Sequence, residues 1–69
     1  MIFKKIGRFA YDVLRVQLEC HVMQIGNGYY IGTFDESGPV SRESVETYTT
    51  FEAVNDALTN DTYTQNWQL

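Results

Sequence analysis

Cysteine, proline, histidine and tryptophan each occur once in this chain of 69 residues, and only five residues are positively charged. Because Cys20 is alone, neither an intramolecular disulfide nor a cysteine-based zinc site can form, and a reducing cytosol is the expected compartment. No apolar run approaches the roughly 20 residues that a membrane-spanning helix needs. Residues 1–15 also lack the uninterrupted apolar core and the cleavage site of a secretory signal. We therefore expect a cytoplasmic protein that folds as one small domain, residues 1–69.

The motifs of common enzyme chemistry are absent as well. The sequence contains no HExxH, no phosphate-binding GxxxxGK[ST] loop and no GxSxG nucleophile elbow. His21 is adjacent to Cys20, and neighbouring residues of a strand point to opposite faces, so a nucleophilic pair is poorly supported. Ser37, Ser41 and Ser44 have no histidine nearby in sequence and are expected to shape a turn. We expect no catalytic residue, no metal and no cofactor.

The few positive charges are concentrated at the start of the chain. Residues 1–15 have a net charge of +3 and residues 16–69 a net charge of −7, which together give the formal −4. The charged residues of the first segment are Lys4, Lys5, Arg8, Asp12 and Arg15. The second segment has Arg42 against eight carboxylates. Such a division predicts two surfaces of opposite potential, so that partners are selected partly by electrostatics.

An amphipathic helix is predicted in the N-terminal segment. Apolar residues recur there at steps of three and four, namely Ile2, Phe3, Ile6, Phe9, Ala10, Val13 and Leu14. Gly7 within this stripe either weakens the helix by about 1 kcal/mol relative to alanine or permits close approach of another backbone. We expect the stripe to cover the protein's own sheet. Joining two copies of the chain, or lying on an anionic membrane, are the alternatives.

The middle of the chain predicts a β-hairpin. Apolar and polar residues alternate over residues 16–25, which is typical of a half-buried strand. Residues 26–28, Gly-Asn-Gly, then predict a turn, and residues 29–34 a second strand. Gly32 marks a bulge or a place where another group approaches the backbone. Turn-forming residues at 35–39 end this strand.

The C-terminal half predicts a third strand and a second helix. Residues 44–48 form the expected strand, after which Thr49 and Glu52 match a capping box. The following helix would bury Phe51, Val54, Ala57 and Leu58 and stop at Asn60-Asp61. Residues 62–69 form either an edge strand or a packed tail. The predicted fold class is α+β in the order α-β-β-β-α, with a final strand left open and an antiparallel sheet of three to four strands.

Acidic residues gather around the single proline. They are Asp35, Glu36, Glu43 and Glu46, with Arg42 as the nearby countercharge. Their spacing does not match the twelve-residue EF-hand loop, so no metal site is expected. Such a patch repels nucleic acid and attracts a basic protein surface, raising the association rate more than the affinity. A merely solvated acidic loop is the alternative.

The aromatic side chains exceed what one small core can fully bury. They include Tyr29, Tyr30, Tyr48, Tyr63 and Trp67. Tyrosine and tryptophan frequently anchor protein interfaces, although packing at the core and its edge is the alternative. The predicted partner-binding residues are therefore Asp35, Glu36, Arg42, Glu43, Glu46, Tyr30 and Tyr48.

Residues 30–58 carry a resemblance. The matching runs are Tyr30-Ile31-Gly32, Gly38-Pro39-Val40-Ser41-Arg42-Glu43-Ser44, Glu46-Thr47-Tyr48, Thr50-Phe51-Glu52-Ala53 and Ala57-Leu58. Together they resemble a strand-loop-strand-helix unit of small uncharacterised proteins from bacteria and their phages. In size and acidity the chain is also similar to phage anti-defence proteins, including anti-CRISPR inhibitors. The resemblance implies an inhibitor and carries over no binding residue.

Three functions follow from these observations. The first is non-catalytic inhibition, in which the acidic surface blocks a basic, nucleic-acid-binding host protein or nucleoprotein complex. The second is a small structural or accessory subunit that forms a homodimer through its N-terminal helix. The third is direct nucleic-acid binding through the basic N-terminal residues, which the net charge of −4 disfavours.

Overall fold

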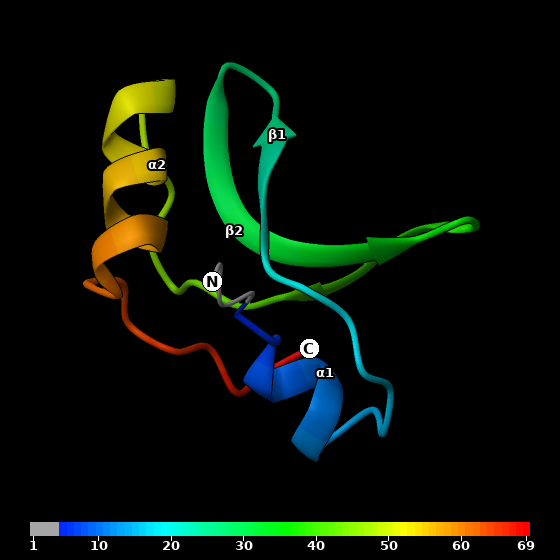
Figure 1. Cartoon of the computed structure of the whole chain (residues 1–69). Helices are drawn as coiled ribbons and strands as arrows, with labels where there is room; N and C mark the ends of the chain where they lie inside the picture. The colour runs from blue at the N-terminus through cyan, green and yellow to red at the C-terminus, as the bar shows by residue number, and fades with distance from the viewer. Residues whose placement is uncertain (1–4) are drawn as a thin grey trace.

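The computed structural model describes residues 5–69 and contains one antiparallel sheet with two helices (Figure 1). The elements are α1 (Arg8–Asp12), β1 (His21–Ile25), β2 (Gly28–Asp35), β3 (Gly38–Arg42) and α2 (Phe51–Asn60). The strands lie in the order β1-β2-β3, and β2 is strongly bent in Figure 1. The predicted α+β class and the α-β-β-β-α order are thereby confirmed. No helix of the part described is long and apolar enough to cross a membrane.

The N-terminal helix is shorter than predicted. α1 is a helix of five residues in which Phe9 and Ala10 are buried, whereas Val13 beyond its end is exposed. Ile2 and Phe3 of the predicted stripe lie outside the described residues. Ile6 is not helical, because it forms an antiparallel bridge with Glu19. The backbone pairing of this segment therefore overrides the helical periodicity of its side chains.

Gly7 explains where the helix begins. Its backbone N–H donates to the Leu18 carbonyl at 2.9 Å, which holds the residue in extended conformation before the first turn. A Cβ on Gly7 would stand 2.6 Å from Thr33 Cγ2 and 2.8 Å from Glu43 Oε2. Gly7 therefore permits close approach, as one of its two predicted roles required, but the groups that approach it are the side chains of Thr33 and Glu43 and not another backbone.

The hairpin forms at the predicted turn. Ile25 pairs with Gly28 around Gly26 and Asn27, and Gly26 adopts φ +56°, which glycine tolerates without strain. β1 begins at His21, later than the predicted strand at residues 16–25, because the chain before it pairs with residues 5–7.

The third strand lies earlier in the chain than predicted. Glu36 and Ser37 alone form the turn after β2, and β3 starts at Gly38, which adopts φ +120°. Residues 44–48 contribute only isolated bridges, so the prediction of a strand there is wrong. Pro39 is accommodated in β3 because the register shifts between Thr33 and Phe34 of β2, opposite it. This bulge follows Gly32, which itself allows close approach: a Cβ there would stand 2.5 Å from the Ser41 carbonyl oxygen.

The second helix begins one residue later than the predicted cap. Thr50, not Thr49, is the N-cap, and its Oγ1 accepts a hydrogen bond from the Ala53 N–H at 3.1 Å. The prediction of a capping box at Thr49 and Glu52 is therefore wrong. The helix ends as predicted, with Asp61 in the left-handed conformation at φ 58°.

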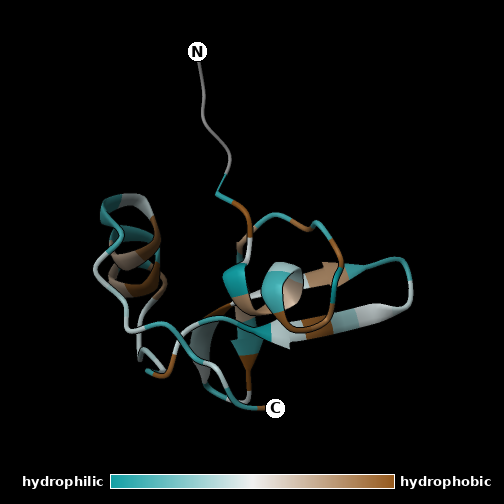
Figure 2. Ribbon diagram, turned by 90° about the horizontal axis from the view of Figure 1, so that it is seen from below, coloured by the Kyte–Doolittle hydropathy of each residue, from teal (hydrophilic) through white to brown (hydrophobic). Residues whose placement is uncertain are grey.

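The core lies between α2 and the sheet. Its buried residues are Cys20, Ile31, Val54 and Ala57, and Val22, Tyr29, Tyr48, Leu58 and Tyr63 pack around them. The ribbon of α2 carries hydrophobic and hydrophilic segments in Figure 2, as expected for a helix with one buried face. Phe51, predicted to be buried, is 54% exposed and meets the ring of Tyr29 edge-on. The tail forms a single bridge, Ser44 with Gln65, so it is a packed tail and not an edge strand.

Candidate functional site

The structure separates the four carboxylates of the predicted acidic surface. Asp35 and Glu36 are exposed at the turn between β2 and β3. Glu43 is fully buried. Glu46 is half-buried and holds the tail, since its carboxylate accepts hydrogen bonds from the backbone N–H of Thr64 at 2.9 Å and from its hydroxyl at 2.7 Å. The prediction that Glu43 belongs to a partner-binding surface is therefore wrong. Of the four carboxylates, only Asp35 and Glu36 are exposed, and Asp35 Oδ1 accepts a hydrogen bond from the Ser37 N–H at 2.8 Å within the turn.

Glu43 is buried because its carboxylate is saturated by hydrogen-bond donors. The backbone N–H groups of Phe9 and Ala10 donate to Oε1 and Oε2 at 2.9 and 3.1 Å. Ser41 donates its hydroxyl to Oε2 at 2.6 Å, and the Gln65 amide donates to Oε1 at 2.8 Å. A buried carboxylate is tolerated when its lone pairs are satisfied in this way. Glu43 thus ties α1, β3 and the tail together, a role that sequence reasoning missed.

The remaining nucleophilic side chains also have structural roles. Ser44 accepts a hydrogen bond from the Ile31 N–H at 3.0 Å and donates to the Glu46 carbonyl at 2.9 Å. Burial is the main cause that raises the pKa of the Cys20 thiol, although a weak hydrogen bond with Tyr63 at 3.9 Å opposes it. Residues 5–69 contain no group of three His, Cys, Asp or Glu side chains positioned to hold a metal ion.

Arg42 and Tyr30, two of the predicted partner-binding residues, lie next to each other in the structure. The Arg42 guanidinium lies 5.5 Å from the centroid of the Tyr30 ring, within the range of a cation–π contact. It also donates to the carbonyls of Ser44 and Val45 at 2.8 and 2.9 Å. Tyr48 lies elsewhere: it packs against the core, and burial, followed by the charge of nearby Glu46, raises the pKa of its phenol.

The sheet has one covered and one open face. Val22 and Ile31 pair across β1 and β2 and point to the face on which α2 packs. Gly7 and α1 approach the same face at Thr33. The opposite face, named the open face here, consists of His21, Met23, Ile25, Tyr30, Phe34 and Arg42. None of these side chains is buried, and both helices of the described chain contact the sheet from the other side.

Contacts within the open face confirm that its side chains form one surface. The rings of His21 and Phe34 lie 4.8 Å apart, and Phe34 is 45% exposed. Ile25 at the other end of β1 is 52% exposed. The alternation of Tyr30 and Phe34 along β2 is visible in the sequence, but it does not say which face the helices leave uncovered.

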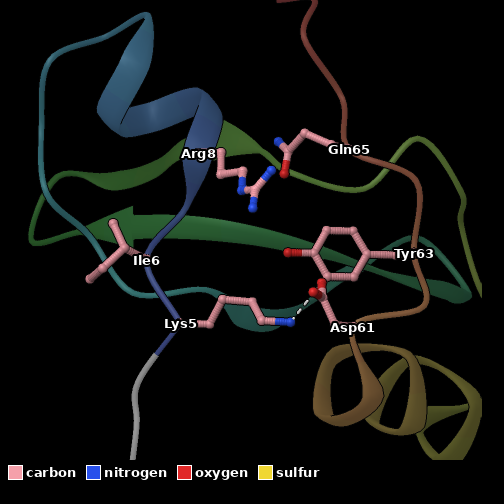
Figure 3. Close-up of a pocket in the computed structure, with 6 residues that line it drawn as sticks. All are labelled: Lys5, Ile6, Arg8, Asp61, Tyr63 and Gln65. Carbon is pink, nitrogen blue, oxygen red and sulfur yellow. Dashed lines mark ion pairs between the residues drawn. The ribbon is translucent and has the colours of Figure 1, made fainter.

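A polar pocket lies between the N-terminal segment and the end of α2 (Figure 3). Its volume is about 260 Å³, and its lining residues are Lys5, Ile6, Arg8, Asp61, Tyr63 and Gln65. Lys5 Nζ forms an ion pair with Asp61 at 2.9 Å and stands 5.2 Å from the centroid of the Tyr63 ring. The hydrogen bond and the charge of Lys5 lower the pKa of Asp61, while burial raises that of Tyr63. Lys5 and Asp61 therefore compensate each other, and Arg8 adds one further positive charge to the lining.

Known proteins add nothing to this description. No protein-family model matches the chain, and no curated protein or solved structure does either. The resemblance to small phage proteins therefore stays a prediction, and function has to be inferred from the chain's own surfaces.

Proposed function

We propose that this protein is a non-catalytic binding module that docks on a basic, nucleic-acid-binding protein and blocks it by occupancy. The binding surface is the open face together with Asp35 and Glu36 at the adjoining turn. The main support is the exposure of Phe34: its side chain is 45% exposed on the open face, and the two exposed carboxylates follow it directly in the sequence. An anchor of this kind, apolar and next to charge, is typical of protein interfaces.

The apolar part of this surface supports binding to a protein. Tyr30, Met23 and Phe34 are residue types enriched at interfaces, and a strand backbone holds them without ordering a flexible loop. A contiguous patch of apolar side chains on the surface of a soluble protein is typical of an interaction site, whereas single exposed apolar residues are common.

The charge of the turn favours a basic partner. Residues 16–41 contain neither lysine nor arginine, so nothing in this segment compensates Asp35 and Glu36. A local negative potential raises the encounter rate with a basic surface, by about 10- to 1000-fold in favourable cases. The net charge of −4 and the small size are suited to an inhibitor encoded by a phage or another mobile element, acting in the cytoplasm.

The two alternatives have less support. Phe9 and Ala10 of α1 are buried against the chain's own sheet, so the described part of this helix offers no apolar stripe to a second copy. Direct nucleic-acid binding would draw on Lys5, which is already paired with Asp61.

Charge-reversal variants test the proposal. We would immobilise the wild-type chain, an Asp35→Lys/Glu36→Lys variant and an Glu52→Lys/Asp56→Lys control, and capture proteins from a bacterial lysate. The control makes the same charge change on the exposed surface of α2. We expect the wild-type and control chains to capture one basic protein that the turn variant does not capture. We also expect the nucleic-acid binding of this captured protein to fall when free wild-type chain is added. Equal recovery on all three, or undiminished nucleic-acid binding, would contradict the proposal.

A further inference from the structure

The two edges of the sheet are built differently. β3 carries three features that discourage pairing with another strand: Pro39 lacks an N–H, a bulge lies opposite it, and Arg42 places a charge at its end. The tail continues this protection, because the Asn66 N–H donates to the Glu43 carbonyl at 2.8 Å. β1 has none of these features. Its sequence His-Val-Met-Gln-Ile contains no proline and no carboxylate, lysine or arginine.

The hydrogen bonds just before β1 show which of its backbone groups face outward. The Cys20 N–H donates to the Lys5 carbonyl at 2.8 Å, on the side of the chain away from β2. Backbone groups of a strand alternate between its two sides, so those of Val22 and Gln24 also point outward. The backbone groups of Met23 and Ile25 instead point toward β2, where these residues pair with Tyr30 and Gly28. Across residues 5–69, no backbone group bonds the outward N–H or carbonyl of Val22 or Gln24.

We infer that β1 pairs with β1 of a second copy of this chain, in antiparallel orientation around Met23. In this register Val22 faces Gln24 of the second copy, and the outward groups of both residues are satisfied. Met23 faces its own equivalent on the open face. The two copies then share one continuous sheet, to which each contributes its three strands. They are related by a two-fold axis, which is the commonest symmetry of small oligomers.

The chemistry of the edge favours a second copy over another partner. A charge close to a two-fold axis lies near its own equivalent and is repelled by it, and β1 carries no formal charge when His21 is neutral. The acidic turn is at the far end of β2 from the β1–β2 turn, so the two copies keep these carboxylates apart (Figure 1). Pairing would also cover apolar surface at Ile25, which is 52% exposed. The inference does not depend on the proposed basic partner.

Two variants of one residue test the pairing. Gln24→Pro removes the outward N–H without removing a β1–β2 hydrogen bond, whereas Gln24→Ala keeps that N–H and serves as the matched control. In analytical ultracentrifugation we expect the wild-type and Gln24→Ala chains at twice the monomer mass of 8.0 kDa, and Gln24→Pro at the monomer mass. A wild-type chain that stays monomeric at millimolar concentration, or a Gln24→Pro chain that remains dimeric, would overturn the inference.

Amide hydrogen exchange provides a second test. It uses only the wild-type chain, so misfolding of a variant cannot affect it. We expect the Val22 and Gln24 amides to exchange at least tenfold faster when the protein is diluted below the dissociation constant, while the Met23 amide, bonded within the hairpin, changes little. Exchange of Val22 and Gln24 that is slow and independent of concentration would show that the chain covers this edge itself. Exchange that is fast at every concentration would show that the edge stays uncovered. Either result contradicts the pairing.

Discussion

The backbone of Gly7 lies against the carboxylate of Glu43, so closely that a Cβ on Gly7 would stand 2.8 Å from Oε2. This contact brings the start of α1 to the end of β3. It places the N–H groups of Phe9 and Ala10 within 2.9 and 3.1 Å of the two carboxylate oxygens. Glycine at this position and glutamate at position 43 therefore depend on each other.

Gly7→Ala is expected to lower the free energy of unfolding by about 1–3 kcal/mol, the usual cost of overpacking a tight site. The new methyl group would meet Thr33 Cγ2 at 2.6 Å, so Thr33→Ser, which removes that methyl, should restore part of the loss. Thermal unfolding of the two single variants and the double variant measures this. Equal melting temperatures for Gly7→Ala and the wild-type chain would contradict the predicted contact.

Glu43→Gln is expected to destabilise the fold by about 1–3 kcal/mol. The amide keeps the shape of the side chain but turns one acceptor into a donor that faces existing donors. Glu36→Gln is the matched control, because Glu36 is exposed at the turn, where such changes stay within about 0.5 kcal/mol. Urea unfolding compares the two. Indistinguishable midpoints would mean that the Glu43 carboxylate does not hold α1, β3 and the tail together.

Thr64→Val is expected to raise the pKa of Glu46 toward its ordinary range. Partial burial alone would raise this pKa, but the hydrogen bonds from the Thr64 side chain and backbone outweigh it and lower the value in the folded protein. A carboxyl with a lowered folded pKa stabilises the fold above its unfolded pKa, and this contribution is lost as the pH falls through the folded value. NMR titration of the Glu46 carboxyl measures the change. A pKa that is the same in both chains would disprove the role of the Thr64 hydroxyl.

The Cys20 thiol is expected to react slowly with a thiol reagent at neutral pH. It is buried in the core, and burial raises its pKa, so little thiolate is present and access requires opening of the fold. Ala57→Gly, which removes a buried methyl group of α2 in the core, should accelerate labelling in proportion to its loss of stability. Ala53→Gly, at an exposed position of α2, costs the same helix propensity without leaving a gap in the core, so it should accelerate labelling less. Labelling of the wild-type chain as fast as that of a free thiol would contradict the burial of Cys20.

The local part of the fold could be predicted from the sequence. Gly26 and Asn27 specify the hairpin turn, because their conformation is decided within the turn itself. The apolar spacing of Val54 and Ala57 identifies the buried side of α2. These features depend on neighbours a few residues apart.

The sequence-based predictions are wrong where contacts between distant segments of the chain determine the structure. Three of the four donors to Glu43 come from positions 34, 33 and 22 residues away, and only Ser41 is close in sequence, so the local sequence does not show that Glu43 is buried while Glu36 is exposed. Pro39 argues against a strand interior, yet β3 is an edge strand with a bulge opposite the proline, where a missing N–H costs little. The open face was also beyond prediction, because alternation defines two faces of β2 without saying which of them the helices cover.

Site-specific photo-cross-linking tests the proposed binding surface most directly. We would introduce a benzophenone side chain at Phe34 on the open face, and separately at Asn55, which is exposed on α2, and irradiate bacterial cells that express each chain. We expect a cross-link to one basic protein from position 34 and none from position 55. Cross-links from position 55 alone, or the same product from both positions, would contradict it.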